Sequence, residues 1–167
     1  MRHQIPAEVK SWIYEAGSLT RRLRCFYGKQ LQVSLLFHQW QPAFPDECRQ
    51  LHIPHHRYQL VREVLLHAEQ TPLILARTIL PEKTIKIAKR NLSHLGTRPL
   101  GEVIFSYPNL ERQQLEITRI KPQLWSEPLK QQINIVDEIW GRRTVYSIQH
   151  QPLLVSEFFL PAALKLS

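Results

Sequence analysis

Residues 58–80 of the chain read YQLVREVLLHAEQTPLILARTIL, and this stretch decides the fold. Two runs rich in apolar residues, Tyr58–Ala68 and Leu73–Leu80, are joined by the short polar connection Glu-Gln-Thr-Pro. Such runs around a tight connection predict two antiparallel strands of a hairpin. Antiparallel neighbours need no helical crossover, so we expect the rest of the sheet to follow the same arrangement.

The remaining segments supply more strands and several helices. Further strands are expected at Gln30–Trp40, Leu110–Ile120, Arg142–Gln149 and Leu153–Leu160. The last two of these read as a second hairpin that turns at His-Gln-Pro. Helices are expected before Gly17, at Leu19–Phe26 with Ser18 as its cap, and between Pro81 and Gly96. The sequence therefore predicts an α+β fold, a single antiparallel β-sheet with helices on one side, formed as one domain by residues 1–167.

The composition is that of a globular protein without a membrane-spanning segment. The 167 residues carry 22 Lys and Arg against 14 Asp and Glu, a formal charge of +8, and 43% of them are hydrophobic. No stretch approaches the roughly 18–20 apolar residues of a spanning helix, and the amino terminus lacks the apolar core of a secretory signal. Cys25 and Cys48 make no disulfide framework. We expect a cytoplasmic protein without stable membrane insertion.

Three ionisable residues interrupt apolar strand faces. Residues two apart in a strand share a face, and on this rule Arg62, Arg77 and Glu157 each fall within a row of aliphatic or aromatic side chains. A buried charge is costly unless it is paired. Two interpretations remain open. Either these faces border solvent or hold a structural ion pair, or the three residues line an enclosed polar pocket that suits a small, flat, anionic molecule.

Four parts of the sequence resemble the chorismate pyruvate-lyase family, in the family's order. They are VREVLL at 61–66, ARTILP at 76–81, LGTRPLG at 95–101, and a carboxy-terminal part made of WGRRT at 140–144 and QPLLVSEFFLP at 151–161. The resemblance implies an antiparallel sheet, an enclosed ligand site under helical flaps, and a monomer. It also implies conversion of chorismate to 4-hydroxybenzoate and pyruvate without a cofactor, the committed step toward quinone head groups.

The same resemblance implies roles for five residues. Arg62 matches the arginine that holds the ring carboxylate, Glu157 matches the glutamate that faces the ring hydroxyl, and Arg77 matches a second arginine beside the pocket. Leu100 matches a residue that contacts the ligand through its backbone. Leu19 falls where some members have a ligand-contacting Met.

This sequence departs from the family pattern at two places. Ala76 stands where members often have Gly before the arginine, and the segment from 121 to 139 is longer than its counterpart in bacterial members. The first departure bears on backbone clearance beside the arginine, and the sequence assigns no role to the longer segment. The chemistry expected from the remaining residues is as follows. Arg62 and Arg77 orient the substrate carboxylates and stabilise negative charge on the departing enolpyruvate, and Glu157 acts at the ring hydroxyl as a base or as an anchor.

Two other classes of function remain open. The first is a non-enzymatic effector module of the same fold that binds a small acid. The second is a basic nucleic-acid-binding protein, suggested by the cations at 83–90 and 21–24, although no helix-turn-helix, zinc-finger or RNA-binding aromatic signature accompanies them. The histidines of the HIPHH stretch at 52–56 have no companion ligands at metal spacing, and Cys25 has no evident activating partner, so neither predicts a site.

Overall fold

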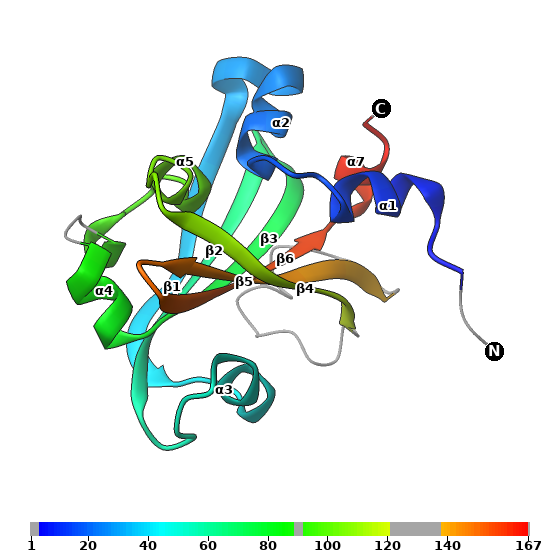
Figure 1. Cartoon of the computed structure of the whole chain (residues 1–167). Helices are drawn as coiled ribbons and strands as arrows, with labels where there is room; N and C mark the ends of the chain where they lie inside the picture. The colour runs from blue at the N-terminus through cyan, green and yellow to red at the C-terminus, as the bar shows by residue number, and fades with distance from the viewer. Residues whose placement is uncertain (1–3, 89–91, 121–137, 167) are drawn as a thin grey trace.

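A six-stranded antiparallel sheet in the order β1-β2-β3-β6-β5-β4 forms the centre of the computed structural model, which describes residues 4–88, 92–120 and 138–166 (Figure 1). The strands are β1 Leu31–Pro42, β2 Tyr58–Ala68, β3 Thr71–Leu80, β4 Leu110–Ile120, β5 Ile139–Ile148 and β6 Gln151–Phe159. The helices are α1 Ala7–Ile13, α2 Leu19–Tyr27, α3 Pro45–Leu51, α4 Glu82–Ala88, α5 Leu100–Ile104 and α7 Pro161–Leu164, with 3-10 turns η1 Gly28–Gln30 and η2 Leu92–His94. The α+β fold with one antiparallel sheet is confirmed.

Capping residues and glycines in the sequence mark several of the observed helix ends. The Ser18 side chain accepts a hydrogen bond from the Arg21 N–H at 3.3 Å and caps α2, and Gly28 with a φ of 55° ends it. The helix expected between Pro81 and Gly96 is divided into α4 and η2, with residues 89–91 outside the described ranges. Most of the segment from 121 to 139 also lies outside the described residues. Helices α5 and α7 are too short to show a periodic pattern, and α3 was not predicted from the sequence.

Both hairpins turn through two residues, and non-glycine residues there adopt positive φ. In the β5–β6 hairpin, Ile148 pairs with Gln151, and the turn residues Gln149 and His150 have φ values of 48° and 69°. Two positive φ values are the mark of the hairpin turn whose twist matches the flanking strands. The turn therefore lies one position before the predicted His-Gln-Pro, and Pro152 belongs to β6 instead. Pairing of β6 with β3 begins only at Leu154, so the N–H that Pro152 lacks is not needed there.

The strand register sorts the polar side chains onto two faces of the sheet. Arg62 is paired with Thr78, and Glu157 is paired with both Ala76 and Arg142, so these residues share one face, called here the pocket face. Helices α1, α2, α4, α5 and α7 pack their apolar side chains against this face. The opposite face, called the far face, is covered in part by α3, whose Cys48 and Leu51 join a separate apolar cluster.

Arg77 lies on the far face, and the expectation that it borders the same pocket as Arg62 is wrong. It is paired with Glu63 in the register, which puts its side chain on the other side of the sheet from Arg62 and Glu157. Its Nε and Nη2 donate to the two carboxylate oxygens of Glu47 in α3 at 2.8 and 2.9 Å, and its Nη1 donates to Glu63 at 2.7 Å. Its guanidinium also stacks on Phe44 at 4.1 Å from the ring centroid. Arg77 is therefore a structural tie between the sheet and α3.

None of the helices in the described parts of the chain combines the length and the apolar composition needed to cross a membrane.

Replacing Glu47 by Ala is expected to destabilise the protein strongly. The Glu47 side chain is fully buried and accepts three hydrogen bonds, two from Arg77 and one from the Phe44 N–H at 2.9 Å. Its loss leaves a buried guanidinium with one carboxylate instead of two, and breaking a buried pair in this way costs about 3–5 kcal/mol. Denaturant unfolding measures the change. Glu82→Ala, which removes an exposed pair with Lys86, is the control and should change stability by less than about 1 kcal/mol. Equal effects of the two variants would contradict the ion-pair assignment.

Gly141→Ala is expected to be destabilising because β5 and β6 approach too closely there for a side chain. A Cβ at position 141 would lie 2.6 Å from the Glu157 carbonyl oxygen and 2.6 Å from the Phe158 ring. Overpacking of this kind costs about 1–3 kcal/mol. Gly17→Ala is the matched control, because nothing lies within 4 Å of its Cβ position. Thermal unfolding of both variants tests the contrast, and a G141A protein as stable as the G17A protein would contradict it.

Candidate functional site

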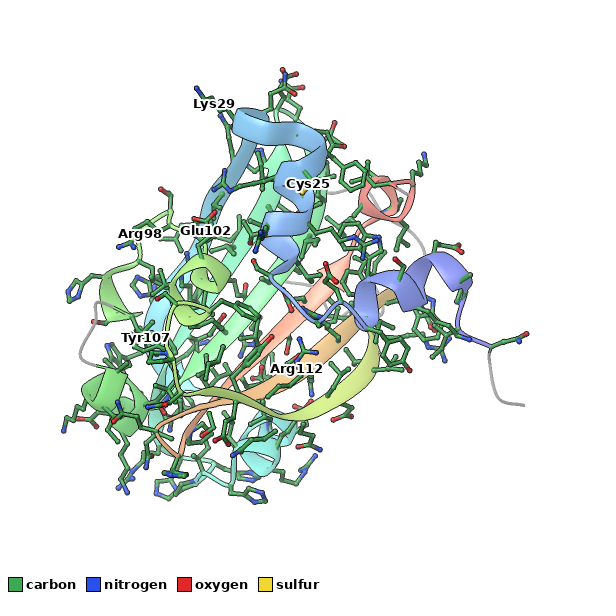
Figure 2. All side chains as sticks on the ribbon, turned by 45° about the horizontal axis from the view of Figure 1, so that its top comes forward. Cys25, Lys29, Arg98, Glu102, Tyr107 and Arg112 are labelled. Atoms are coloured by element: carbon green, nitrogen blue, oxygen red, sulfur yellow. The ribbon has the colours of Figure 1, made fainter. Side chains whose placement is uncertain are left out.

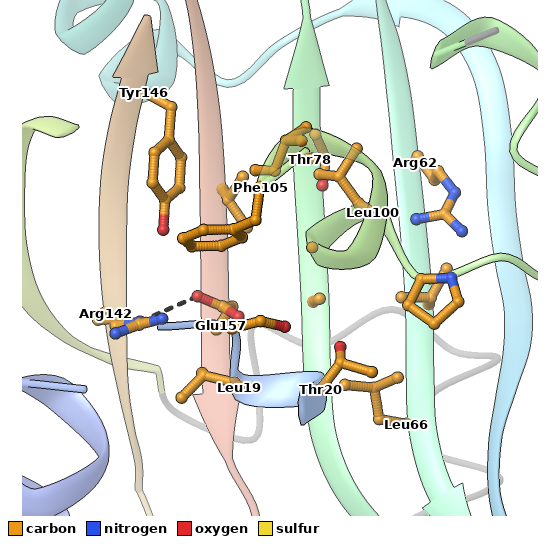
Figure 3. A pocket seen from close by; sticks show the side chains of 17 residues that line it. Leu19, Thr20, Arg62, Leu66, Thr78, Leu100, Phe105, Arg142, Tyr146 and Glu157 are labelled. Carbon is orange, nitrogen blue, oxygen red and sulfur yellow. Dashed lines mark hydrogen bonds and ion pairs between the residues drawn. The ribbon is translucent and has the colours of Figure 1, made fainter. Parts of the chain in front are cut away.

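A cavity lies between the pocket face of the sheet and the helices α2 and α5. The space between its lining side chains is about 500 Å³ when the open solvent beside it is included. The sheet contributes its polar lining, with Arg62 from β2, Thr78 from β3, Glu157 from β6 and Arg142 from β5 (Figure 3). Helices α2 and α5 close the cavity from above through Ser18–Thr20 and Pro99–Phe105. The structure thus brings together four of the five predicted site residues, all except Arg77.

Arg62 is a buried cation with no carboxylate partner among the described residues. Only 2% of the residue is exposed, and its Nη2 donates to the backbone carbonyls of Gly96 at 3.2 Å and Arg98 at 2.8 Å. Its Nε is buried and makes no hydrogen bond to any described residue. Burial lowers the pKa of Arg62 to about 10, so the guanidinium remains charged near neutral pH. A cation in this state is stabilised by an anion that enters the cavity.

The neighbours of Arg62 add no negative charge to offset it. His38 of β1 is its partner in the strand register. Partial burial first, and then the positive charge of Arg62 and the nearby His94, hold the pKa of His38 below its ordinary value. His38 is therefore neutral near pH 7 and adds no second cation beside the guanidinium. The two carbonyls that hold Arg62 belong to the LGTRPLG stretch at 95–101, where Gly96 adopts a φ of 59°.

Glu157 stands two strands away from Arg62, on the other side of β3, and is held by Arg142. The strand spacing separates the two backbones by roughly 10 Å across the sheet. The Arg142 Nε donates to Glu157 Oε1 at 2.9 Å, and its Nη1 donates to the carbonyls of Ile13 and Glu15 at 3.2 and 2.8 Å. The arrangement presents a guanidinium and a carboxylate to one enclosed space.

Arg142 is the site residue that the sequence reasoning missed. The position of the turn in the second hairpin would have revealed it. Cross-strand partners can be counted outward from a two-residue turn, one residue on each strand at a time. From the observed turn at 149–150, Arg142 faces Glu157, whereas a turn centred on Gln151 would have paired it with Leu160. The observed turn begins one residue earlier and is one residue shorter than the predicted His-Gln-Pro turn, which shifts the partner of Arg142 by three positions and hid its pairing with Glu157.

Apolar side chains form the remaining walls of the cavity. Leu19 at the start of α2 and Leu100 at the start of α5 are both buried and both line it, as does Ala76 of β3. Phe105 and Tyr146 stack edge to face with ring centroids 5.9 Å apart, on the same side as Glu157 (Figure 3). Walls of this kind favour a flat, unsaturated ligand ring.

The two covering helices contact each other above the cavity. Arg24 of α2 pairs with Glu102 of α5 at 2.6 Å, and Figure 2 shows Glu102 projecting from α5 toward α2. Beneath this pair, a Cβ on Gly101 would lie 2.9 Å from the Ser18 Oγ, so glycine permits the close approach. The helical cover expected from the family resemblance is thus present, formed by α2 and α5.

The polar groups of the cavity suit an organic anion rather than a metal ion. Within residues 4–88, 92–120 and 138–166, no three His, Cys, Asp or Glu side chains gather as metal ligands. The guanidinium of Arg62 can hold a carboxylate through planar, paired hydrogen bonds, and Glu157 can accept from a hydroxyl. A small molecule with an acid group at one end and a hydroxyl at the other matches both.

Comparisons with known proteins agree with this geometry. The chain matches the family model described as chorismate lyase over residues 2–165. It is 42% identical over 156 residues to a protein named probable chorismate pyruvate-lyase of Methylococcus capsulatus, covering 93% of this chain and 96% of that one. A protein of the same name from Nitrosomonas europaea is 34% identical over 165 residues, covering 96% and 91%.

Solved structures of low sequence identity share the fold. A GntR-family transcriptional regulator from Bacillus cereus superposes with a TM-score of 0.61 at 16% identity, over 83% of this chain and 96% of that one. The PhnF C-terminal domain gives a TM-score of 0.59 at 14% identity, over 76% and 80%. At these identities the likeness concerns architecture alone, whereas the family match and the curated relatives span nearly the whole sequence. The chain therefore belongs to the chorismate lyase family, a family of carbon–oxygen lyases.

Proposed function

We propose that this protein is a chorismate pyruvate-lyase that converts chorismate to 4-hydroxybenzoate and pyruvate. The observation that carries the proposal is Arg62, a buried cation without a carboxylate partner among the described residues, which lines a cavity shared with Glu157. The 167 residues would act as one domain in this reaction. The names of the curated relatives support the choice of chorismate among small hydroxy acids.

The reaction needs only elimination from the substrate. The bond between the ring carbon and the enolpyruvyl ether oxygen breaks, and its electron pair leaves with the enolpyruvate. The neighbouring ring carbon, which bears the hydroxyl, loses its hydrogen as a proton, and the ring becomes aromatic. The proton ends on the methylene carbon of the enolpyruvate, which becomes pyruvate. All atoms balance, and the gain of aromaticity drives the step, so holding a reactive geometry supplies much of the catalysis.

In this proposal each polar side chain has a separate task. Arg62 binds the ring carboxylate and fixes the orientation of the ring. Glu157 accepts a hydrogen bond from the ring hydroxyl, and acts there either as a base toward the proton on the same carbon or as an anchor of the ring. Leu100 contacts the ligand through its backbone, and Leu19 packs against the ring. Arg77 has no part at the reacting atoms, because its side chain lies on the far face.

The same proposal covers the oligomeric state, the cellular location and the use of the product. The protein works as a monomer in the cytoplasm, binds no nucleic acid, and supplies 4-hydroxybenzoate to the synthesis of ubiquinone or plastoquinone. In this proposal the reaction uses neither a metal nor a redox carrier. The substrate exchanges no atoms or electrons with a second reactant. The surplus of positive charge attracts a substrate with two carboxylates and has no further role in specificity.

The proposal is tested by incubating the purified protein with chorismate alone and measuring both products. Equimolar 4-hydroxybenzoate and pyruvate are expected. Arg62→Ala should lower kcat/KM for pyruvate release roughly 100- to 1,000-fold, the usual loss when a preorganised electrostatic contact is removed. Arg49→Ala is the matched control, since it removes one exposed arginine from α3 on the far face. Near-normal turnover by the R62A protein would refute the assignment of Arg62.

The same assay separates the other two function classes. Binding of 4-hydroxybenzoate or chorismate without turnover would favour a non-enzymatic effector module of the same fold. Neither binding nor turnover, together with affinity for DNA or RNA that falls steeply with salt, would favour a nucleic-acid-binding protein.

A further inference from the structure

Arg142 donates hydrogen bonds to three groups of the protein itself, one carboxylate and two backbone carbonyls, which points to a role beyond direct contact with a substrate. The residue is 1% exposed and lies in the middle of β5. Its guanidinium spans from the carboxylate of Glu157 to two backbone carbonyls at the end of α1, those of Ile13 and Glu15. The carbonyl of Ile13 has no partner within the helix, because the last turn of a helix leaves its carbonyls free, and Glu15 lies just beyond the C-cap Tyr14. One planar group thus joins the sheet to the end of α1.

The connection between α1 and α2 is held by a second arginine of the neighbouring strand. Arg112 reaches from β4 to the carbonyls of Glu15 and Ala16 at 3.2 and 3.4 Å (Figure 2). The next residues along the chain, Ser18 and Leu19, line the cavity. The position of the cover over the ligand site is therefore linked, through residues 13–16, to the same guanidinium that holds Glu157.

We propose that Arg142 is a positioning residue for the reaction, which fixes the Glu157 carboxylate and couples it to the α1–α2 connection that leads into the cover. The inference rests on the proposed function, since it assigns the partner of Glu157 in that site. Glu157 has no other ion-pair partner among the described residues. Without Arg142 its side chain can rotate away from the ring hydroxyl, and its charge is no longer offset.

The shape of the guanidinium is essential to this role. Its Nε and Nη1 point in different fixed directions and donate to Glu157 and to the carbonyls at the same time. A lysine ammonium is a single point charge on a flexible chain and cannot reproduce both sets of contacts. We therefore expect Arg142→Lys to fold, because it keeps a buried cation beside Glu157, and yet to lose the alignment of the carboxylate.

The test is a double-mutant cycle in the full chain with chorismate as substrate. Arg142→Lys, Glu157→Gln and the double variant are compared with the unchanged protein for kcat and KM. Arg142→Lys is expected to lower kcat about 10-fold or more with a smaller change in KM, and the double variant should be no slower than E157Q alone, since residues that act as a unit are not additive. Losses that multiply, or an unchanged kcat in the R142K protein, would overturn the proposal.

The split between kcat and KM gives a readout that a purely structural role would not move. Arg142→Gln is the second variant if R142K is insoluble, because the Gln side chain can still donate to a carbonyl. This variant is expected to lower kcat more than it changes KM, and a kcat equal to that of the unchanged protein would contradict the proposal.

Arg143→Lys is the matched control. Arg143 follows Arg142 directly, but it lies on the far face and pairs with Asp46 of α3. Its replacement should leave kcat and KM unchanged, and an effect equal to that of R142K would contradict the specific role of Arg142. If the unchanged protein releases no pyruvate from chorismate, the proposed function fails. If it turns over and the cycle is additive, only the role of Arg142 fails.

Discussion

Side chains of a strand alternate between the two faces of a sheet, and in this protein that constraint separates the buried charges into two groups. On the far face, Arg77 is neutralised by Glu47 and Glu63 and ties α3 to the sheet. On the pocket face, Arg62 has two carbonyls and no carboxylate among the described residues, while Arg142 and Glu157 pair with each other. Arg62 and Arg77 belong to neighbouring strands, so their backbones are close and only the alternation assigns them to different tasks.

The two groups also differ in what they contribute to stability. In a buried ion pair with good geometry, the attraction between the charges offsets much of the free energy lost on desolvation. Arg77 is in this situation. A buried cation without a counter-ion has no such offset, which is the condition of Arg62 among the described residues. The partners of Arg62 in the described parts of the chain are two backbone carbonyls, whose dipoles offset part of its charge. The remaining free energy is recovered when an anion binds, so the ligand-free site is destabilised in a way that favours binding of a carboxylate.

The sequence predicted the sheet better than it predicted the site. Long runs such as Tyr58–Ala68 and Leu110–Ile120 have the alternating or continuous apolar pattern of strands, and the observed strands match them. Four of the predicted site residues line one cavity, as expected: Arg62, Glu157, Leu19 and Leu100. The roles assigned to them remain predictions. Arg77 was misplaced because its own strand pattern cannot say which face is the pocket face. The register between strands decides this. Between β2 and β3 the register shifts at Leu66 and His67, a β-bulge that the strand pattern does not reveal, and the shift places Arg62 opposite Thr78 instead of Arg77.

The hairpin turns contain no Asn-Gly or Asp-Gly pair, and Glu69, Gln149 and His150 all adopt positive φ. Each non-glycine residue in this region is strained by about 1 kcal/mol or more. The strands therefore impose their alignment on the turns, through cross-strand packing of residues such as Tyr146 and Leu153, rather than the reverse. Gln149 and His150 are not among the residues that line the ligand cavity. Because the strands set the alignment, a residue inserted at this turn would lengthen the loop, and Arg142 would remain opposite Glu157.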